Sequence, residues 1–166
     1  MSKFIKAAVA SSVLAASVMG ANAAHAATAT ADARANILEE LTVTKDAGTD
    51  LDFGTIVTTG TAETVTVGTD GVRAACTAVV CSGASDAADF SVTGSASEAV
   101  TLTVPGSVTL TGPGGAIMNA NLNSSALTAL DASGNGAFSV GGALDVAATQ
   151  ADGAYVGTFT VTVDYP

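Results

Sequence analysis

The chain has 166 residues, and its 15 acidic residues against 5 basic ones give a formal net charge of −10 at pH 7. A surface this acidic repels nucleic acid and anionic lipid, so we expect neither as a partner. Apolar residues make up 48% of the chain, which is too many for a disordered tail, and abundant Thr, Val, Ala and Gly without Trp are typical of a secreted β-protein.

The N-terminus has the pattern of a secretory signal peptide. Lys3 and Lys6 begin it, a mainly apolar run follows, and Ala24-His25-Ala26 is a small-x-small cleavage site. We expect residues 1–26 to be removed, with a cut after Ala23 as the alternative. The apolar run is too short and too rich in Ser to cross a bilayer, and no later run is long enough, so we expect export and no membrane span.

An N-terminal arm, residues 27–37 (ATATADARANI), alternates strictly between apolar and polar residues. This period of two is typical of a β-strand with one dry face. No adjacent segment looks like its hairpin partner, so we predict a donor strand that completes a sheet in a neighbouring copy of the protein. The dry face, which would form the donor-strand interface, consists of Ala27, Ala29, Ala31, Ala33, Ala35 and Ile37.

Two alternatives for the arm remain open at this point. Residues 31–41 are rich in helix formers and could form a helix capped by Thr30 or Asp32. The arm could also join the sheet of its own domain.

Residues 38–166 are suited to a single domain with one core. Short alternating segments separated by Gly-rich turns, without sustained helical periodicity, predict an all-β fold, an antiparallel β-sandwich. Asp70-Gly71 indicates a hairpin turn. Residues 117–130 contain too much Asn and Ser for a definite element. The expected strands cover residues 41–44, 51–56, 62–67, 72–80, 90–93, 99–104, 108–111, 138–140, 144–146 and 155–165.

The last of these strands, residues 155–165, has the clearest alternation in the domain. Its aromatic residues, together with Phe53, Phe90 and Phe138, are most of those that follow the predicted signal peptide. We therefore expect the core to centre on this strand, because burying such side chains contributes about 1.5–3 kcal/mol each.

Cys76 and Cys81 are the two cysteines, and an exported pair is usually oxidised. On one straight strand, five residues would separate them by about 16 Å and turn them to opposite faces. A disulfide therefore requires a bend within residues 77–80, although Thr-Ala-Val-Val is poor turn material. We still favour the bridge, as a local clip, because free thiols seldom survive export.

The residues offer little for catalysis. The single histidine, His25, lies in the predicted signal peptide, so the rest of the chain cannot build a Ser-His-Asp, Cys-His or His-metal site. Asp46, Asp50 and Asp52 could share a calcium ion, but their spacing does not fit an EF-hand and a solvated turn is the preferred interpretation. We expect a protein that is not an enzyme, with no catalytic residues, metal or cofactor.

Several motifs, in order along the chain, resemble a bacterial family of secreted, pilin-like proteins that share a domain of unknown function. They are Leu51-Asp52-Phe53-Gly54-Thr55-Ile56, Asp89-Phe90-Ser91-Val92-Thr93-Gly94, Phe138-Ser139-Val140-Gly141-Gly142 and the closing run of residues 151–165. The closing run is also similar to spore coat protein U and to archaic chaperone-usher pilins.

This resemblance implies an incomplete immunoglobulin-like fold. A periplasmic chaperone and then the arm of the next subunit would donate the missing strand, and an outer-membrane usher would guide assembly. The resemblance places an acceptor groove along the last strand, at Phe159, Val161, Val163 and Tyr165. The extra Pro166 departs from a chain that ends in Tyr and puts the usual register in doubt.

Two functions follow as hypotheses. The first is a structural subunit of an extracellular, fimbria-like fibre, a homopolymer assembled by donor-strand exchange that serves attachment or biofilm cohesion. The second is a monomeric, secreted or periplasmic binding module with a sandwich that completes itself. A hydrolase is a weaker third possibility.

Overall fold

A computed structural model describes residues 27–166, and the predicted signal peptide, residues 1–26, lies outside them. The chain divides into two units, one that ends at Ala35 and a domain formed by Asn36–Pro166. No helix of the described residues is long and apolar enough to cross a membrane.

The arm is free of secondary structure. Residues 27–41 lie in no helix or strand, so the alternative helix at 31–41 is wrong. Residues 27–37 are exposed, and 91% of Ile37 is accessible to solvent. The Arg34–Asp32 ion pair, at 3.1 Å, is also exposed and adds little to stability. The strand expected from the alternation is thus not paired within this chain.

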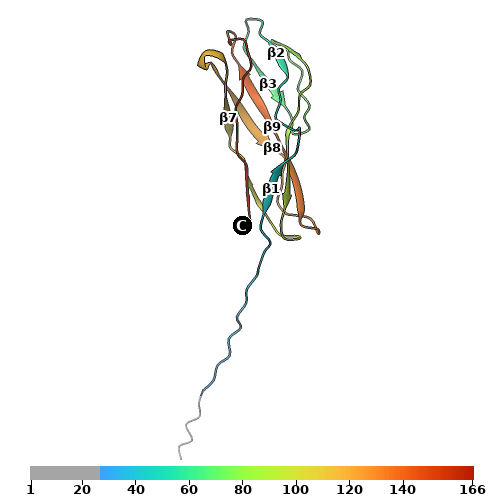
Figure 1. Cartoon of the computed structure of the whole chain (residues 1–166), viewed down its shortest axis with the longest axis vertical. Helices are drawn as coiled ribbons and strands as arrows, with labels where there is room; N and C mark the ends of the chain where they lie inside the picture. The colour runs from blue at the N-terminus through green and yellow to red at the C-terminus, as the bar shows by residue number, and fades with distance from the viewer. Residues whose placement is uncertain (1–26) are drawn as a thin grey trace, which may run out of the picture. The chain divides into compact units, whose positions relative to one another are not determined.

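The domain consists of strands and one 3₁₀ turn, Pro113–Gly115 (Figure 1). The strands are β1 (Thr42–Lys45), β2 (Thr55–Val57), β3 (Glu63–Val67), β4 (Val80–Ser82), β5 (Ala88–Thr93), β6 (Thr101–Thr103), β7 (Ser107–Thr111), β8 (Ile117–Ser124), β9 (Asn135–Val146) and β10 (Thr162–Asp164).

All strand pairs are antiparallel, and β9 is the central strand of the main sheet. The order is β1-β5-β9-β8-β7, and β3 pairs with the second half of β9 where β5 ends. The pairs β10-β6 and β2-β4 form two smaller sheets. The predicted all-β antiparallel sandwich is confirmed.

Two apolar clusters fill the domain, one along each half of β9. The first contains Phe90 and Phe138, which lie opposite each other on β5 and β9 with stacked rings 5.0 Å apart, and it includes Val163 of β10. The second contains Phe53 and Leu144. The core therefore centres on β9 and not on the last strand, because β9 pairs with β5 and then β3 along its length and with β8 at its middle.

The strands at β1, β3, β5, β6 and β7 are confirmed, with shifts of one or two residues at their ends. Residues 117–130, for which the sequence predicted no definite element, contain β8, in which Met118, Ala120 and Leu122 face inward and three asparagines face outward. The expected strand 72–80 is wrong. The chain turns at Gly71, Arg73 forms a single isolated bridge with Val67, and the chain then bends.

Candidate functional site

The C-terminal segment, residues 155–161, runs extended along the domain without a complete set of partners. Val156 forms an isolated bridge with Thr111 at the end of β7, and β10 pairs with β6 further on. Between them, residues 157–161 make no backbone hydrogen bond to any described residue. The predicted strand 155–165 is therefore formed only at β10.

On the other side of the domain, β1 is equally incomplete. It pairs with β5 along Thr42–Lys45, and its second edge has no strand beside it in the described chain. The main sheet curls from β1 round to β7, and the C-terminal segment follows β7. The curl thus leaves one open seam, which lies between β1 and the C-terminal segment.

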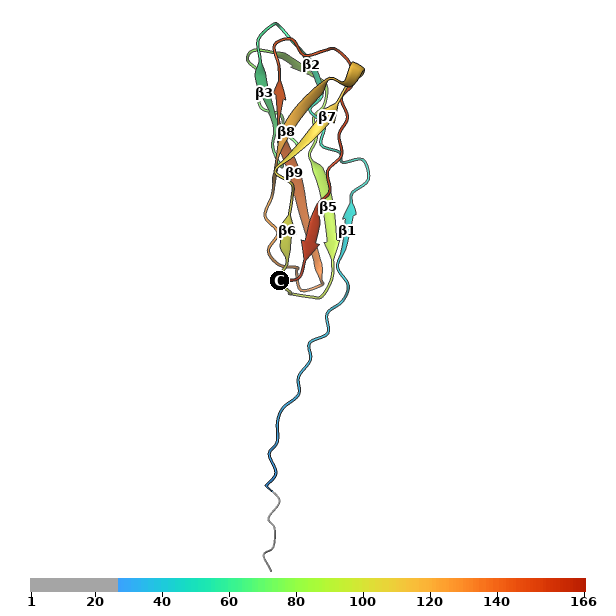
Figure 2. The same cartoon turned by 90° about the vertical axis from the view of Figure 1, so that its left-hand side faces the viewer.

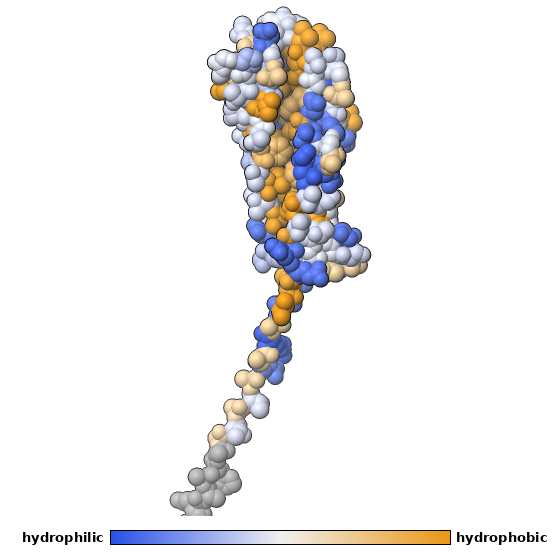
Figure 3. Space-filling view, in the orientation of Figure 1, coloured by the Kyte–Doolittle hydropathy of each residue, from blue (hydrophilic) through white to orange (hydrophobic). Residues whose placement is uncertain are grey.

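A groove of about 670 Å³ occupies this seam. Val43 and Lys45 of β1 line one wall, Phe159 and Val161 line the other, and Phe90 lies at the base. Figure 3 shows apolar side chains along a hollow that runs down the middle of this face, between more polar flanks. The groove therefore offers two unpaired backbone edges and an apolar floor.

The groove continues into a far pocket of about 640 Å³, at the end of the domain that contains β2 and β3. Leu51, Leu110 and Tyr155 line both cavities. The floor of the far pocket is apolar, because the half-buried Met118 and the buried Leu144 line it. Together the two cavities form one channel beside the C-terminal segment.

A clamp, which we define as Tyr165, Ser95 and Glu39, lies beyond the opposite end of the groove. The Tyr165 hydroxyl donates to the Glu39 carbonyl at 2.9 Å and accepts from the Ser95 N–H at 2.8 Å. The Glu39 N–H donates to Ser95 Oγ at 2.6 Å. Figure 2 shows the C-terminus and the start of β1 at this same end. The clamp thus joins the two chain segments that border the groove.

The four residues proposed for the groove from the resemblance divide into two groups. Phe159 and Val161 are half-buried and line the groove. Val163 is buried in the core opposite Leu102, and Tyr165 belongs to the clamp. Neither of these two lines the groove.

The disulfide between Cys76 and Cys81 is present, with Cα atoms 6.0 Å apart. The sequence did not reveal what bends the chain between them. Glu63, at the start of β3, accepts backbone N–H bonds from Thr77, Ala78 and Val79 at 2.7–2.8 Å. The Thr77 N–H bond above all, with the other two and the Thr77 hydroxyl, lowers the pKa of Glu63 from 4.5 to about 2, against an opposing effect of desolvation.

Arg73 is a second structural residue that the sequence did not indicate. Its guanidinium donates to the backbone carbonyls of Phe53, Ser82 and Gly83 at 2.9–3.3 Å. It therefore ties β2 and β4 to the turn after β3. Its signal in the sequence was weak, because a single arginine shortly after a turn is usually solvated.

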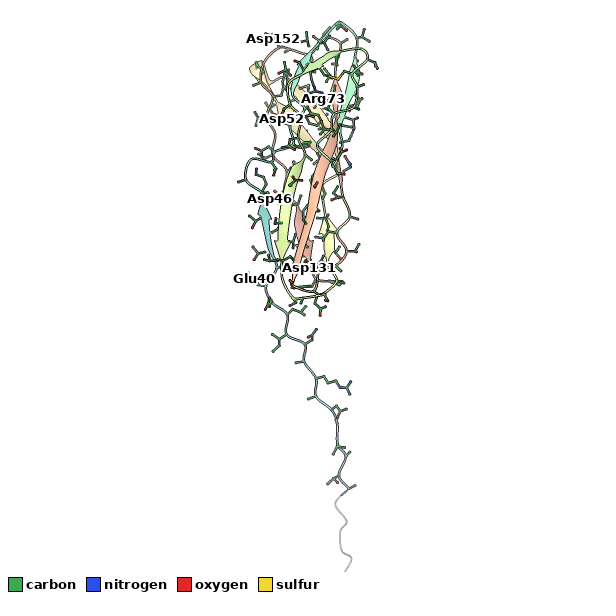
Figure 4. The ribbon with its side chains drawn as sticks, turned by 90° about the vertical axis from the view of Figure 1, so that its right-hand side faces the viewer. Glu40, Asp46, Asp52, Arg73, Asp131 and Asp152 are labelled. Carbon is green, nitrogen blue, oxygen red and sulfur yellow. A yellow bond between two sulfur atoms is a disulfide. The ribbon has the colours of Figure 1, made fainter. Side chains whose placement is uncertain are left out.

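The aspartates considered for calcium have separate partners. Asp46 accepts from Ser91, Asp50 pairs with Lys45 at 2.8 Å, and Asp52 accepts from the Gly54 N–H. Asp46, Asp52 and Asp152 lie at different heights along the domain (Figure 4). Within residues 27–166 no three acidic, His or Cys side chains are grouped to hold a metal ion.

The fold and the groove define an antiparallel β-sandwich domain with an open strand seam. The chain belongs to the family described as Domain of unknown function (DUF4402), whose model matches residues 41–165. The match covers the domain and both walls of the groove. No curated protein and no solved structure matches the chain.

Proposed function

We propose that this protein is a structural subunit of an extracellular fibre, in which the arm of one copy fills the groove of another. The observation that carries the proposal is the seam, whose two walls, β1 and residues 157–161, each have a free backbone edge. The unpaired, alternating arm supplies a strand of matching type. No catalytic step is part of this proposal.

Strand addition suits these residues because its affinity comes mainly from the backbone. Each main-chain hydrogen bond contributes about 0.5–1.5 kcal/mol net. The five arm alanines bury little surface, and small side chains fit a groove whose wall already contains Phe159. Ile37 is the one large apolar residue of the arm, so it fixes the register, since a slip of one residue would expose the whole apolar face.

The far pocket favours one direction of the donated strand. If the arm runs antiparallel to the C-terminal segment, Ile37 comes to lie at Tyr155, beside Met118 in the far pocket. The donor domain then begins beyond the far pocket, at the end opposite the acceptor's clamp. Successive domains would join end to end in an open chain. The reverse direction would bring two clamp ends together and favour a closed pair.

Resemblance supports the remaining parts of the proposal. The likeness of the closing run to spore coat protein U and archaic chaperone-usher pilins suggests an incomplete immunoglobulin-like topology. It also suggests a periplasmic chaperone, an outer-membrane usher and a fibre at the cell surface. The N-terminal pattern of residues 1–26 is consistent with export through a signal peptide.

The test combines size and crosslinking. The full-length chain is expressed in an exporting bacterium, and its size is measured by gel filtration and electron microscopy. Ala31→Cys and Val161→Cys are then made in separate chains and mixed under oxidising conditions. We expect fibres or ladders in the first experiment and mixed disulfide dimers in the second. Thr30→Cys, on the polar face of the arm, is the matched control and should crosslink far less.

A single outcome supports the alternative, a monomeric binding module. In that case the chain elutes as a monomer at every concentration, and Ala31→Cys and Val161→Cys crosslink only when they are present in the same chain. This result would contradict the fibre proposal.

A further inference from the structure

We propose that the clamp of Tyr165, Ser95 and Glu39 keeps the arm out of the groove of its own domain, so that the groove stays free for a second copy. This inference rests on the proposed function and specifies how its partner is chosen. Leu38 joins the arm to Glu39, and the clamp holds Glu39 at the end of the domain opposite the far pocket.

An arm that entered its own groove would have to reverse direction between Ile37 and Thr42. It would then lie beside the free edge of β1 as the second strand of a hairpin. The turn would have to be built from Leu38, Glu39, Glu40 and Leu41. Two-residue hairpin turns require positive φ angles and favour Gly, Asn or Asp, and none of these four residues is of that kind. The reversal would therefore need a longer loop, which would include Glu39.

The clamp adds a cost to the reversal. Both backbone groups of Glu39 are already hydrogen-bonded, the N–H to Ser95 Oγ and the C=O to the Tyr165 hydroxyl. A turn at this residue would break both bonds. The Tyr165 hydroxyl also accepts the Ser95 N–H, so the three residues are fixed as a unit.

Packing around the clamp leaves little room for another route. A Cβ atom placed on Gly94 would lie 2.5 Å from the Tyr165 hydroxyl and 2.8 Å from Leu41. The side chains of Tyr165 and Leu41 therefore fill the space beside Gly94, next to the clamp. The channel continues instead at its other end, through the far pocket. A strand from another molecule can enter there without disturbing Glu39.

Trypsin distinguishes a free arm from an inserted one. Arg34 is the single Lys or Arg of the arm, and its side chain is 87% exposed. The full-length chain and its Tyr165→Phe and Ser95→Ala variants are refolded at low concentration, and the monomer is isolated by gel filtration. The rate of cleavage after Arg34 is then measured. Ser125→Ala is the matched control, because it also removes a serine hydroxyl that accepts a backbone N–H, from Ser139 at 2.9 Å, outside the clamp and the groove.

We expect the wild-type and Ser125→Ala monomers to be cut rapidly after Arg34. In Tyr165→Phe and Ser95→Ala the fraction of protected monomer should rise about tenfold, and multimers should decrease in parallel. Equal cleavage rates in all four proteins would overturn the proposed role of the clamp. A wild-type monomer that is already protected from cleavage after Arg34 would overturn it too. If the wild type never multimerises at high concentration, the fibre proposal fails, while the cleavage rates still decide the role of the clamp.

Discussion

The ring of Phe159 meets the ring of Phe90 edge-on, with centroids 6.4 Å apart and planes inclined by 62°. This contact joins the C-terminal segment to β5 across the floor of the groove. Phe159 remains half-buried because no strand covers it in the described chain, whereas Phe90 is buried. The pair therefore sets the depth at which a donated strand would lie.

Phe138 and Phe159, two of the aromatic residues of the first core cluster, should differ in their contribution to stability. Phe138 is 2% exposed, so Phe138→Ala should lower the free energy of unfolding by about 3–5 kcal/mol. Phe159→Ala should cost about 1–2 kcal/mol in the monomer, because Phe159 is only partly buried and loses one edge-on contact. Urea denaturation measures both. Equal losses would mean that the seam is closed in solution.

Ile37 should be essential for assembly and unimportant for folding. Ile37→Asp should abolish multimers seen by gel filtration, because the charge would enter an apolar groove, and leave the unfolding midpoint of the monomer unchanged, because Ile37 is 91% exposed. Ile117→Asp is the matched control, since Ile117 is also exposed but lies on β8 outside the groove. Normal multimers in Ile37→Asp would contradict the role of the arm.

The direction of the arm can be measured by crosslinking to the far pocket. Ile37→Cys in one chain should form a disulfide with Met118→Cys in another, because an antiparallel arm brings residue 37 to the far pocket. Ala29→Cys should not reach Met118→Cys, since eight residues of strand span about 26 Å. The opposite preference, with products that stop at dimers, would indicate a closed pair.

Glu63 should make stability depend on pH. Its pKa is lowered in the folded state to about 2, so its contribution is complete above about 4.5 and is lost as the pH falls toward 2. The pKa of Asp131 is also lowered, by N–H bonds from Asn135 and Ser133, and acts in the same direction. Glu63→Gln should be less stable than wild type at pH 7 and approach it at pH 2. Thermal unfolding across this range, with the exposed Glu40→Gln as control, checks the prediction.

The disulfide should act as a local clip. Cys76 and Cys81 close a short loop, so their replacement by serine should cost about 2 kcal/mol in the chain-entropy model. Glu63 holds the same bend through three backbone N–H groups, and the fold should therefore persist. Circular dichroism and urea unfolding of the double variant measure the loss. Complete unfolding would show that the bridge is required for the fold.

The sequence by itself determined the class of fold and most of the strands. Alternation at β1, β3, β5 and β7 was readable because each has one face toward the core and one toward solvent. These features depend on local patterns of apolar and polar residues, which a chain carries before it folds. The bridge between Cys76 and Cys81 was instead favoured by the expected export, and the wall formed by Phe159 and Val161 was suggested by the family resemblance.

Only the tertiary structure decided which strand is central and which edges stay open. β8 was missed because its outward face is asparagine, and residues 155–161 alternate like a strand although they have no complete set of partners. The bend at the disulfide depends on Glu63, 14 residues before Thr77, and the clamp joins Tyr165 to Glu39 across 126 residues. Hydrogen bonds between such distant residues form only when the chain has folded, so no local pattern announces them.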